Sequence, residues 1–441
     1  MKLLDERNDD FLWQLDEMLK RNTPDREPEV ERTVREIIED VRTEGDEALF
    51  KYARKLDKTD IDASNVEVSK KEFETALAQV KPEIYSALER AYARIKAFHV
   101  RQLEHYCPGG FEYKDAIGVK LGMKVEPMDR VGLYVPGGKA AYPSSVLMSA
   151  APAKVAGVRE VVMVSPQRSD FFHPNLLAAA KIAGVDRVFR VGGAQAIAAL
   201  AYGTETVPRV DKIVGPGNAY VSCAKRLVYG LVGIDMVAGP SEILVIGDGS
   251  ANPAFIAADL LSQAEHDESA RAIFITTSEW EAKAVIEEVN CQLETLERKK
   301  IAQQSIEDNG VVILVGNLDR AATIANMLAP EHLEILCEHH HAVLGKIKNA
   351  GAIFLGRYSP EALGDYMAGP NHILPTGGSA RFRGPLGVHD FFRHSSVIEA
   401  SKKAFMELAK DVEEIARSEE LNAHAHSVLI RAAKEKPKNE R

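Results

Sequence analysis

Nine short runs of β-forming residues, separated by segments of helix length, constrain the fold of this 441-residue chain most strongly. Glycine, proline and polar turn formers bound most of these runs. They lie at residues 131–138, 160–166, 185–193, 211–218, 242–249, 272–278, 311–317, 333–338 and 352–356. Strands that alternate with helices in this way are typical of βαβ units, so we predict parallel sheets covered by helices on both faces. Nine strands are enough for two such sheets, with a division near Gly239.

Both ends of the chain have the period of amphipathic helices instead. Apolar residues recur at helical spacing from Val30 to Val41 and stop at Gly45, after which Asp46 can cap a second helix. We predict that the first hundred residues are helical, with a break at Pro82. Near the C-terminus, apolar residues between 405 and 415 share one helical face. Such ends are expected to pack elsewhere, for example on a second subunit.

The overall composition disfavours several classes of protein. Acidic residues outnumber basic ones by 65 to 55, and the net charge of -10 disfavours binding to nucleic acid or to anionic membranes. No apolar run approaches the length of a membrane span, and we identify no export signal. The four cysteines, Cys107, Cys223, Cys291 and Cys337, form no CxxC pair, so we expect neither a disulfide scaffold nor a thiolate zinc site. We predict a cytoplasmic protein of two or three domains.

Three glycine-rich turns follow predicted strands and are candidates for binding an anionic ligand. They are Pro136–Gly138, Gly192–Gln195 and Gly215–Asn218. In open α/β sheets, ligands bind at the carboxyl ends of strands, where the N-termini of helices favour negative charge. None of the turns has the GxGxxG pattern of a dinucleotide site, and glycine also serves chain reversal alone. A nucleotide site and purely structural turns both stay open at this point.

Candidate metal ligands occur first near the end of a predicted helix. Gln263 and His266 are three residues apart and share one helical face. An imidazole and a carbonyl oxygen could together supply two ligands to a divalent metal, but glutamine is an unusual zinc ligand. A polar helix end without any metal is the competing interpretation.

Two further groups of polar residues lie closer to the C-terminus. Asp365 and His372 stand among glycines and prolines, where a loop can turn both side chains toward one centre or can merely connect two elements. Glu419 and His424 in the last helical segment are either surface residues or ligands. The residues themselves do not decide between these alternatives.

The dipeptide Glu331-His332 lies at the entry to a predicted strand. A carboxylate beside an imidazole can divide proton transfer between two groups, each of which burial can tune toward neutral pH. The dipeptide is also common by chance. The histidine-rich run Glu338–His341 follows a strand end in a polar stretch, and we interpret it as a solvated loop.

Taken together, eight motifs resemble those of the histidinol dehydrogenase family, in family order and across nearly the whole chain. They are VGLYVPGG, VGGAQAIAALAYGT, IVGPGNAYV, AGPSEILV, SQAEHD, APEHLE, GDYMAGPNHILPTGG and ELNAHA. The resemblance is specific, because eight separate segments would have to coincide. It implies an α/β fold with two incomplete Rossmann-like domains, small helical parts at both ends, and two chains that intertwine as a homodimer.

The resemblance also divides the chain into four regions. Residues 1–115 would be a helical N-terminal region, 116–238 a first Rossmann-like domain on the NAD side, and 239–396 a second such domain with the metal and catalytic residues. Residues 397–441 would form a C-terminal helical segment that completes the partner's site.

Carried over residue by residue, the resemblance implies a complete site. One zinc ion per subunit would be held by Gln263, His266, Asp365 and His424. The catalytic pair falls on Glu331 and His332. The substrate L-histidinol would contact the four zinc ligands, His332, and also Ser241, His372 and Glu419. The NAD cofactor would contact Tyr134, Gln195 and Asn218.

The activity implied is the NAD-dependent, four-electron oxidation of L-histidinol through L-histidinaldehyde to L-histidine, the last steps of histidine biosynthesis. Two departures from the family pattern bear on substrate choice: Glu420 replaces a usual glycine, and Arg383-Gly384 replaces a usual serine pair. A related dehydrogenase of another small alcohol, such as a sulfonate diol, is therefore the first alternative. A zinc hydrolase and a metal-binding assembly protein are the others.

Overall fold

The structure is a computed structural model that describes residues 1–21, 28–106, 109–137, 141–167 and 172–433. The chain divides into two compact units. The first comprises residues 1–102 and 128–391, and the second comprises residues 103–127 and 392–441.

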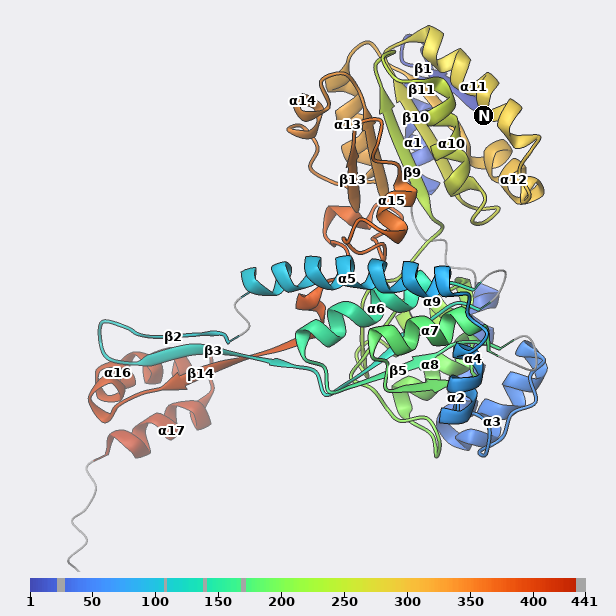
Figure 1. Cartoon of the computed structure of the whole chain (residues 1–441). Coiled ribbons are helices and arrows are strands. Elements are labelled where there is room, and N and C mark those ends of the chain that lie inside the picture. The colour runs from blue at the N-terminus through green and yellow to red at the C-terminus, as the bar shows by residue number, and fades with distance from the viewer. Residues whose placement is uncertain (22–27, 107–108, 138–140, 168–171, 434–441) are drawn as a thin grey trace, which may run out of the picture. The chain divides into compact units, whose positions relative to one another are not determined.

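Five parallel strands form one sheet of the first unit, in the order β6-β5-β4-β7-β8. Strand β5 of this sheet is labelled in Figure 1. The strands are β4 (Arg130–Tyr134), β5 (Glu160–Val164), β6 (Arg187–Phe189), β7 (Lys212–Val214) and β8 (Gly233–Ile234). The connecting helices are α6 (Pro143–Ala156), α7 (Pro174–Ala183), α8 (Gly193–Tyr202) and α9 (Ala219–Val228). Because βαβ crossovers are right-handed, the reversal of strand order after β6 puts α6 and α7 on one face and α8 and α9 on the other.

Two helices from the N-terminal region complete the core over α8 and α9. They are α2 (Pro28–Glu44) and α3 (Asp46–Tyr52), and their buried apolar residues join the same cluster. The predicted apolar stripe of α2 is confirmed, since Val34, Ile37, Ile38 and Val41 are all buried. The prediction that Asp46 caps α3 is wrong: Gly45 is the capping residue, and the Asp46 carboxylate accepts a hydrogen bond from the Thr206 hydroxyl at 2.9 Å instead.

Six parallel strands form the other sheet of the first unit, in the order β1-β11-β10-β9-β12-β13. The strands are β1 (Lys2–Asp5), β9 (Glu242–Gly247), β10 (Arg271–Thr276), β11 (Val311–Leu314), β12 (His332–Leu336) and β13 (Ala352–Leu355). The helices around them are α1 (Phe11–Arg21), α10 (Pro253–Ala264), α11 (Glu279–Leu293), α12 (Lys299–Asn309), α13 (Leu318–Leu328) and α14 (His340–Leu344). One face packs against α1 and α13, and the opposite face packs against α10, α11 and α12.

The prediction that the first hundred residues are helical is wrong at the N-terminus, where a strand forms. β1 lies parallel to β11, with Leu3 opposite Val312, and adds an edge strand to the six-stranded sheet. Its four residues include only two apolar side chains, and its partner lies about 300 positions away, so a local pattern could not reveal it. All nine predicted strands are present in the two sheets.

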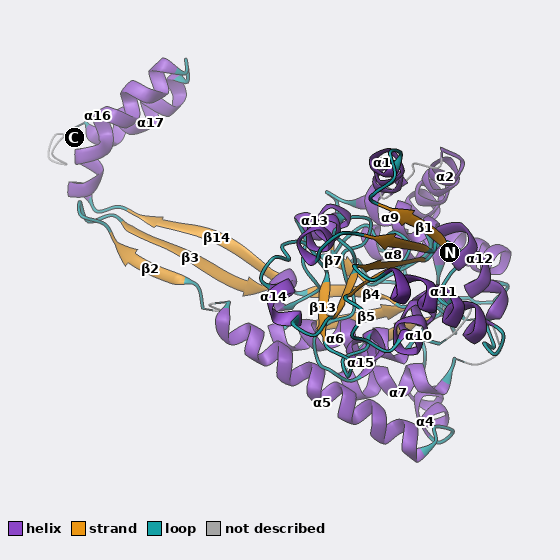
Figure 2. Cartoon of the chain, turned by 90° about the horizontal axis from the view of Figure 1, so that it is seen from above, coloured by secondary structure: helices purple, strands orange, loops and turns teal. Residues whose placement is uncertain are grey.

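The second unit is a three-stranded antiparallel sheet with a helical hairpin (Figure 2). Its strands are β2 (Phe111–Lys114), β3 (Lys120–Pro127) and β14 (Phe392–Glu399), in the order β14-β3-β2. The hairpin consists of α16 (Lys402–Ser418) and α17 (Asn422–Ala432), which pack together through alanines such as Ala409, Ala416 and Ala425. The predicted apolar face of α16 is largely exposed, with Leu408, Val412 and Ile415 at 38%, 44% and 60%.

The remaining elements connect these layers. They are the π-helical turn η1 (Ala53–Asp57), α4 (Lys70–Leu77), α5 (Pro82–His105), α15 (Glu361–Tyr366), and the 3-10 turns η2 (Ser379–Arg381) and η3 (Val388–Phe391). The predicted break at Pro82 is confirmed, because this proline is the first residue of α5.

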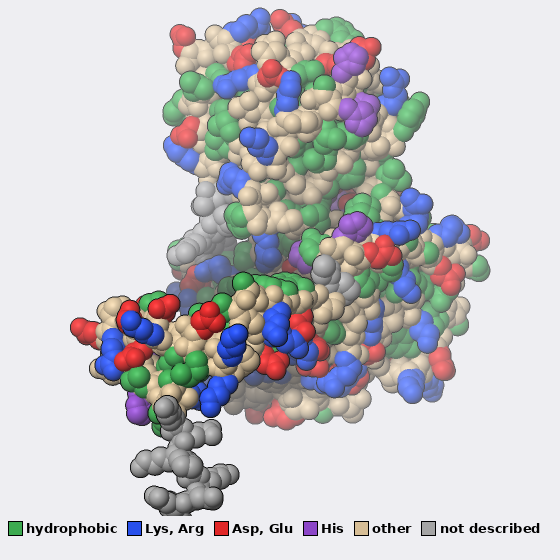
Figure 3. All heavy atoms as spheres, turned by 90° about the vertical axis from the view of Figure 1, so that its left-hand side faces the viewer, with side chains coloured by type: hydrophobic (Ala, Val, Ile, Leu, Met, Phe, Trp, Pro, Cys, Tyr) green, Lys and Arg blue, Asp and Glu red, His purple; other side chains and the backbone are tan. Residues whose placement is uncertain are grey.

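Two surface properties follow the composition. In the part of the chain that the structure describes, no helix is both long enough and apolar enough to cross a membrane. On the face drawn in Figure 3, basic and acidic side chains are interspersed, without a wide field of one sign.

Candidate active site

The catalytic pair expected from the sequence lies at the amino edge of the six-stranded sheet. Glu331 directly precedes β12, and His332 is its first residue, paired with Ile243 of β9. Both side chains are buried, with Glu331 7% and His332 4% exposed. In a parallel sheet, the covering helices run back toward the amino ends of the strands, so the C-terminal end of α10 also reaches this edge. The fold therefore brings Gln263 and His266 to the same edge of the sheet as Glu331 and His332.

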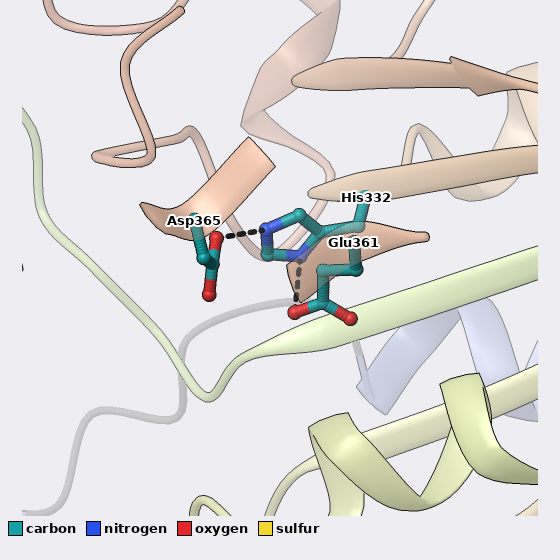
Figure 4. Close-up of side chains that lie close together, drawn as sticks. All are labelled: His332, Glu361 and Asp365. Atoms are coloured by element: carbon teal, nitrogen blue, oxygen red, sulfur yellow. Dashed lines mark ion pairs between the residues drawn. The ribbon is translucent and has the colours of Figure 1, made fainter. Parts of the chain in front are cut away.

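His332 presents one ring nitrogen toward the site. Its Nδ1 lies 3.0 Å from the carbonyl oxygen of Glu242, to which it donates a hydrogen bond. Its Nε2 has no hydrogen-bond partner among the described residues and lies 3.8 Å from Oδ1 of Asp365 (Figure 4). Burial lowers the pKa of His332 to about 4, so the ring is neutral at pH 7. A neutral imidazole with an unpartnered Nε2 can accept a proton there.

Glu331 is a carboxyl group of raised basicity. Its Oε2 accepts a hydrogen bond from the backbone N–H of Glu242 at 2.9 Å and lies 3.7 Å from Nδ1 of His332. Burial raises the pKa of Glu331 well above its usual value, and the nearby carboxylates of Glu242 and Asp365 raise it further. A carboxylate tuned in this way can take a proton from water near neutral pH.

Glu361 belongs to this group of side chains, although the sequence analysis did not identify it. Its Oε1 lies 3.7 Å from Nδ1 of His332, and the side chain is nearly inaccessible to solvent. His332, Glu361 and Asp365 each offer a ligand atom within 4.8 Å of the others, so they could surround a cation (Figure 4). The residue opens a helix after a proline, where a glutamate is ordinary, and so gave no separate signal.

Among the described residues, Gln263 is deeply buried and has free amide atoms, as a metal-binding side chain would. It is 1% exposed, and neither its amide oxygen nor its amide nitrogen has a hydrogen-bond partner among the described residues. Leaving both atoms of a buried amide unsatisfied is costly unless a bound group satisfies them. His266 is half-buried, and its charge, when protonated, lowers the pKa of both His332 and His372.

His372 joins the same region through two hydrogen bonds. Its Nδ1 donates to the backbone carbonyl of Asp365 at 3.0 Å, and its Nε2 lies 3.4 Å from Oγ of Ser145 in α6. Burial lowers the pKa of His372. Ser241, half-buried, directly precedes β9 and thus lies at the amino edge of this sheet beside the catalytic pair.

Two predicted site residues belong to the second unit instead. Glu419 caps the C-terminal end of α16, His424 lies in α17, and both side chains are exposed there. The structure thus places Glu331, His332, Gln263, His266, Asp365 and His372 in the first unit, whereas Glu419 and His424 belong to the second.

The predicted cofactor residues lie at the carboxyl edge of the five-stranded sheet, where its strands end. Tyr134 ends β4, and its hydroxyl accepts a hydrogen bond from the N–H of Gly193 at 3.2 Å. Gln195 is fully buried in α8, and its Nε2 donates to Asp57 at 3.1 Å, while its Oε1 has no partner among the described residues. Asn218 caps α9 through Val221 N–H. In the first glycine-rich turn, Gly138 lies outside the described residues.

Comparison with known proteins decides the family. A family model described as histidinol dehydrogenase matches residues 19–432. The chain is 52% identical to the histidinol dehydrogenase of Aquifex aeolicus over 434 residues, which cover 98% of this chain and 99% of that protein. This chain belongs to the histidinol dehydrogenase family. The family member from Geobacter sulfurreducens is also 52% identical, over 98% of this chain and all of that protein.

A solved structure of a histidinol dehydrogenase has the same fold. The crystal structure of the enzyme from Elizabethkingia anophelis matches with a TM-score of 0.89 at 36% identity and covers 98% of each chain. The resemblance inferred from eight motifs is thus confirmed, and with it the predictions of a mixed α/β fold and of an oxidoreductase of the histidinol dehydrogenase family with a role in histidine biosynthesis.

Proposed function

We propose that this protein oxidises L-histidinol through L-histidinaldehyde to L-histidine, using one zinc ion per subunit and two molecules of NAD per substrate. One observation carries the proposal: His332 is buried and neutral, its unpartnered Nε2 lies beside Asp365, and its Nδ1 lies 3.7 Å from the carboxyl group of Glu331, whose pKa is raised. This arrangement offers two proton acceptors of different strength at one centre, one for each of two successive oxidations.

The proposed zinc ligands are Gln263, His266, Asp365 and His424. The unpartnered amide of Gln263 supports this set, because a metal would satisfy its buried oxygen. When bound, zinc would hold and orient the imidazole and amino nitrogens of the substrate. The mixed nitrogen and oxygen donors suit zinc and leave space for substrate atoms.

For the cofactor, we propose contacts from Tyr134, Gln195 and Asn218. The unpartnered Oε1 of buried Gln195 supports a polar ligand at this edge, and the edge is the one where α/β sheets bind nucleotides. When bound, NAD would accept the hydride that leaves the substrate carbon. The chain's own residues must then handle the protons.

In the first oxidation, Nε2 of His332 takes the proton of the substrate hydroxyl group while a hydride leaves the carbon that bears this group. The alcohol thereby loses two electrons and becomes an aldehyde. The hydrogen bond from Nδ1 to the Glu242 carbonyl fixes the tautomer in which Nε2 is the acceptor, and it stabilises the imidazolium that forms.

In the second oxidation, Glu331 takes a proton from water, and the hydroxide adds to the aldehyde carbon to give the monoanion of the hydrate. Loss of a second hydride from that carbon gives the carboxylic acid, which releases its proton to become the carboxylate, so that four electrons leave in total. Ser241, His372 and Glu419 are proposed to hold the substrate through both steps. The buried surroundings of the pair exclude bulk water and help to retain the aldehyde.

We propose a homodimer in which the segment 397–441 completes the partner's site, in line with the proposed division into regions 1–115, 116–238, 239–396 and 397–441. The exposed apolar face of α16, with Leu408, Val412 and Ile415, supports this, because such a face is stable when another surface covers it. A cytoplasmic location is also proposed. Free thiols at Cys223, Cys291 and Cys337 are suited to a reducing compartment.

The decisive experiment measures NADH produced per molecule of L-histidinol consumed, with zinc present and after removal of zinc by a chelator. Two NADH per substrate, lost with the metal and restored on its return, is the expected result. One NADH would indicate an alcohol dehydrogenase that stops at the aldehyde. No NADH would overturn the proposal and lead to assays with sulfonate diols and then with hydrolase substrates.

A further inference from the structure

A second carboxyl group lies on the same strand as the catalytic histidine. Glu334 follows His332 by two residues in β12, so the two side chains are on the same face of the sheet. Glu334 is 0% exposed, and β12 lies in the interior of the sheet between β9 and β13. A carboxyl group buried at this depth needs hydrogen-bond partners inside the protein.

Its first partner is the helix that carries Asp365. Oε1 of Glu334 accepts a hydrogen bond at 2.7 Å from the backbone N–H of Glu361, the first residue of α15. The capping position before it is Pro360, whose side chain makes no capping hydrogen bond, so the Glu334 carboxyl connects this end of α15 to the strand.

Its second partner is the helix that carries Gln263. The carboxyl groups of Glu334 and Asp259, in α10, lie close enough that each shifts the pKa of the other. Two carboxyl groups this close can form a hydrogen bond when one of them holds a proton. Oε2 of Glu334 finds no N–H or O–H donor among the described residues, as expected if this oxygen is itself the donor. Burial and the nearby Asp259 raise the pKa of Glu334 well above its usual value, which places the proton on Glu334.

The spacing of these carboxyl residues matches that of the site residues. Asp259 precedes Gln263 by four residues in α10, and Glu361 precedes Asp365 by four in α15, so each pair shares one helical face. The side chain of Glu334 interacts with both helices, with Asp259 of α10 and with Glu361 of α15. The three elements that carry Gln263, Asp365 and His332 are therefore joined through one side chain.

We propose that Glu334 is a positioning residue, which, through Asp259 and the N–H of Glu361, holds Gln263, Asp365 and His332 in one fixed arrangement. This inference deepens the proposed function, because it concerns the elements that carry the proposed metal ligands and base. Residues that orient ligands in this way change metal affinity by ten- to a hundredfold when they are replaced. A misplacement of about 1 Å at the reacting centre costs about a hundredfold in rate.

The test compares Glu334→Gln with Glu334→Leu. Glutamine keeps an oxygen that accepts the N–H of Glu361 and gains an N–H donor for Asp259, whereas leucine has a similar volume and neither group. We expect Glu334→Leu to weaken zinc binding and to lower kcat at least about tenfold, and Glu334→Gln to stay within about threefold of wild type in both. Zinc affinity is measured by competition with a chelating dye, and ligand geometry by the visible spectrum of the cobalt-substituted protein.

A second pair of variants at Asp259 covers the case in which Glu334→Leu does not fold. Asp259 is only half-buried, and Asp259→Asn keeps an acceptor for the Glu334 proton, whereas Asp259→Ala does not. We expect loss of zinc affinity with alanine and its retention with asparagine. The proposal is overturned if Glu334→Leu and Asp259→Ala bind zinc and turn over like wild type. It is also overturned if Glu334→Gln and Asp259→Asn are as impaired as the leucine and alanine variants.

Failure of the proposed function would look different. Wild-type protein that binds no zinc or reduces no NAD would refute that function, whereas the link between Glu334 and Asp259 is measured separately by melting temperatures of the metal-free single and double variants. Non-additive shifts support the link, and additive shifts refute it.

Discussion

At the scale of single residues, burial decides the chemistry of this site more than the identity of neighbouring charges does. The same desolvation lowers the pKa of His332 and raises that of Glu331, because it disfavours the charged form of each. An imidazole that stays neutral and a carboxyl group of raised basicity are the result. These two states suit the roles of two different proton acceptors that we propose for the adjacent residues.

The role of His332 is testable through its side chain alone. We expect His332→Gln to lower kcat by about 100- to 10,000-fold while zinc stays bound, because the base is lost and the proposed ligands are untouched. Steady-state kinetics and metal analysis of the purified protein measure both quantities. His341→Gln, at an exposed position, is the matched control and should be neutral. Loss of zinc together with activity would mean that His332 is a ligand and not the base.

Glu420, the departure from the family's usual glycine, has a conformational cost. Its φ is 60°, in the left-handed region that favours glycine. We expect Glu420→Gly to raise the free energy of unfolding by about 1 kcal/mol, measured by urea denaturation. Asp411→Gly, in the interior of α16, should lower it by a similar amount. A destabilised Glu420→Gly would show that the glutamate side chain makes a compensating contact.

At the scale of elements, the two sheets use opposite edges. The proposed cofactor residues lie at the carboxyl ends of β4, β6 and β7, whereas Glu331 and His332 lie at the start of β12, at the amino edge of the other sheet. Ligand binding at carboxyl ends is the general tendency of open α/β sheets, so the amino-edge site is unusual. The helix end at Gln263 and helix α15, which carries Asp365, reach this edge because the chain returns there from the carboxyl end of the preceding strand.

One helix holds the loop that contains His372 through a buried histidine. His99 of α5 is 0% exposed, its Nδ1 donates to Gln102 at 3.1 Å, and its Nε2 accepts from the amide of Asn371 at 3.4 Å. Burial lowers the pKa of His99 to about 4. Between that value and about 6.5, the unfolded chain binds the proton and the folded chain does not, so stability falls as the pH falls through this window.

His99→Asn should remove this dependence. Relative to the variant, wild type should lose about 2 kcal/mol of unfolding free energy between pH 7 and pH 5. Urea denaturation of the metal-free proteins at the two pH values measures the difference, and His394→Asn in the exposed strand β14 is the control. Parallel losses in wild type and His99→Asn would show that His99 titrates normally in the folded protein.

The turn before α9 depends on a buried ion pair. Lys225 and Asp235 are 2% and 1% exposed, and both bind the backbone of Gly215, through its carbonyl at 2.8 Å and its N–H at 2.7 Å. Lys225→Met should lower the free energy of unfolding by about 3–5 kcal/mol, because it leaves a buried carboxylate unpaired.

Adding Asp235→Leu to Lys225→Met is the internal control for that prediction. The double variant should lose less stability than the sum of the two single variants, as measured by denaturant titration, because the second change removes the unpaired charge. Additive losses would mean that the two side chains do not stabilise each other.

At the scale of the whole molecule, the proposed sharing of sites between chains has a direct test. Inactive His332→Gln chains mixed with inactive His424→Ala chains should recover about a quarter of wild-type activity, because half of the dimers are hybrids and each hybrid has one intact site. Activity after dissociation and reassociation of the mixture is the measurement. Hybrids confirmed by mass that stay inactive would show that each chain supplies its own His424.

The division of labour between sequence and tertiary structure follows from the range of the interactions involved. Strand and helix periods, glycine turns and motifs such as APEHLE depend on neighbouring residues, so the nine strands, the helix of Val30–Val41 and membership of the family were predictable. By contrast, β1 pairs with a strand about 300 positions away, and β3 and β14 pair across a comparable separation. No local pattern contains such pairings.

Tertiary structure alone determined the chemical state of the site. Burial makes His332 neutral and raises the pKa of Glu331, and it leaves the amide of Gln263 without partners; none of these properties belongs to the residue type. It also brought in Glu361 and Glu334, which are ordinary glutamates in the sequence. Desolvation depends on everything packed around a group, so it exists only once distant segments have met.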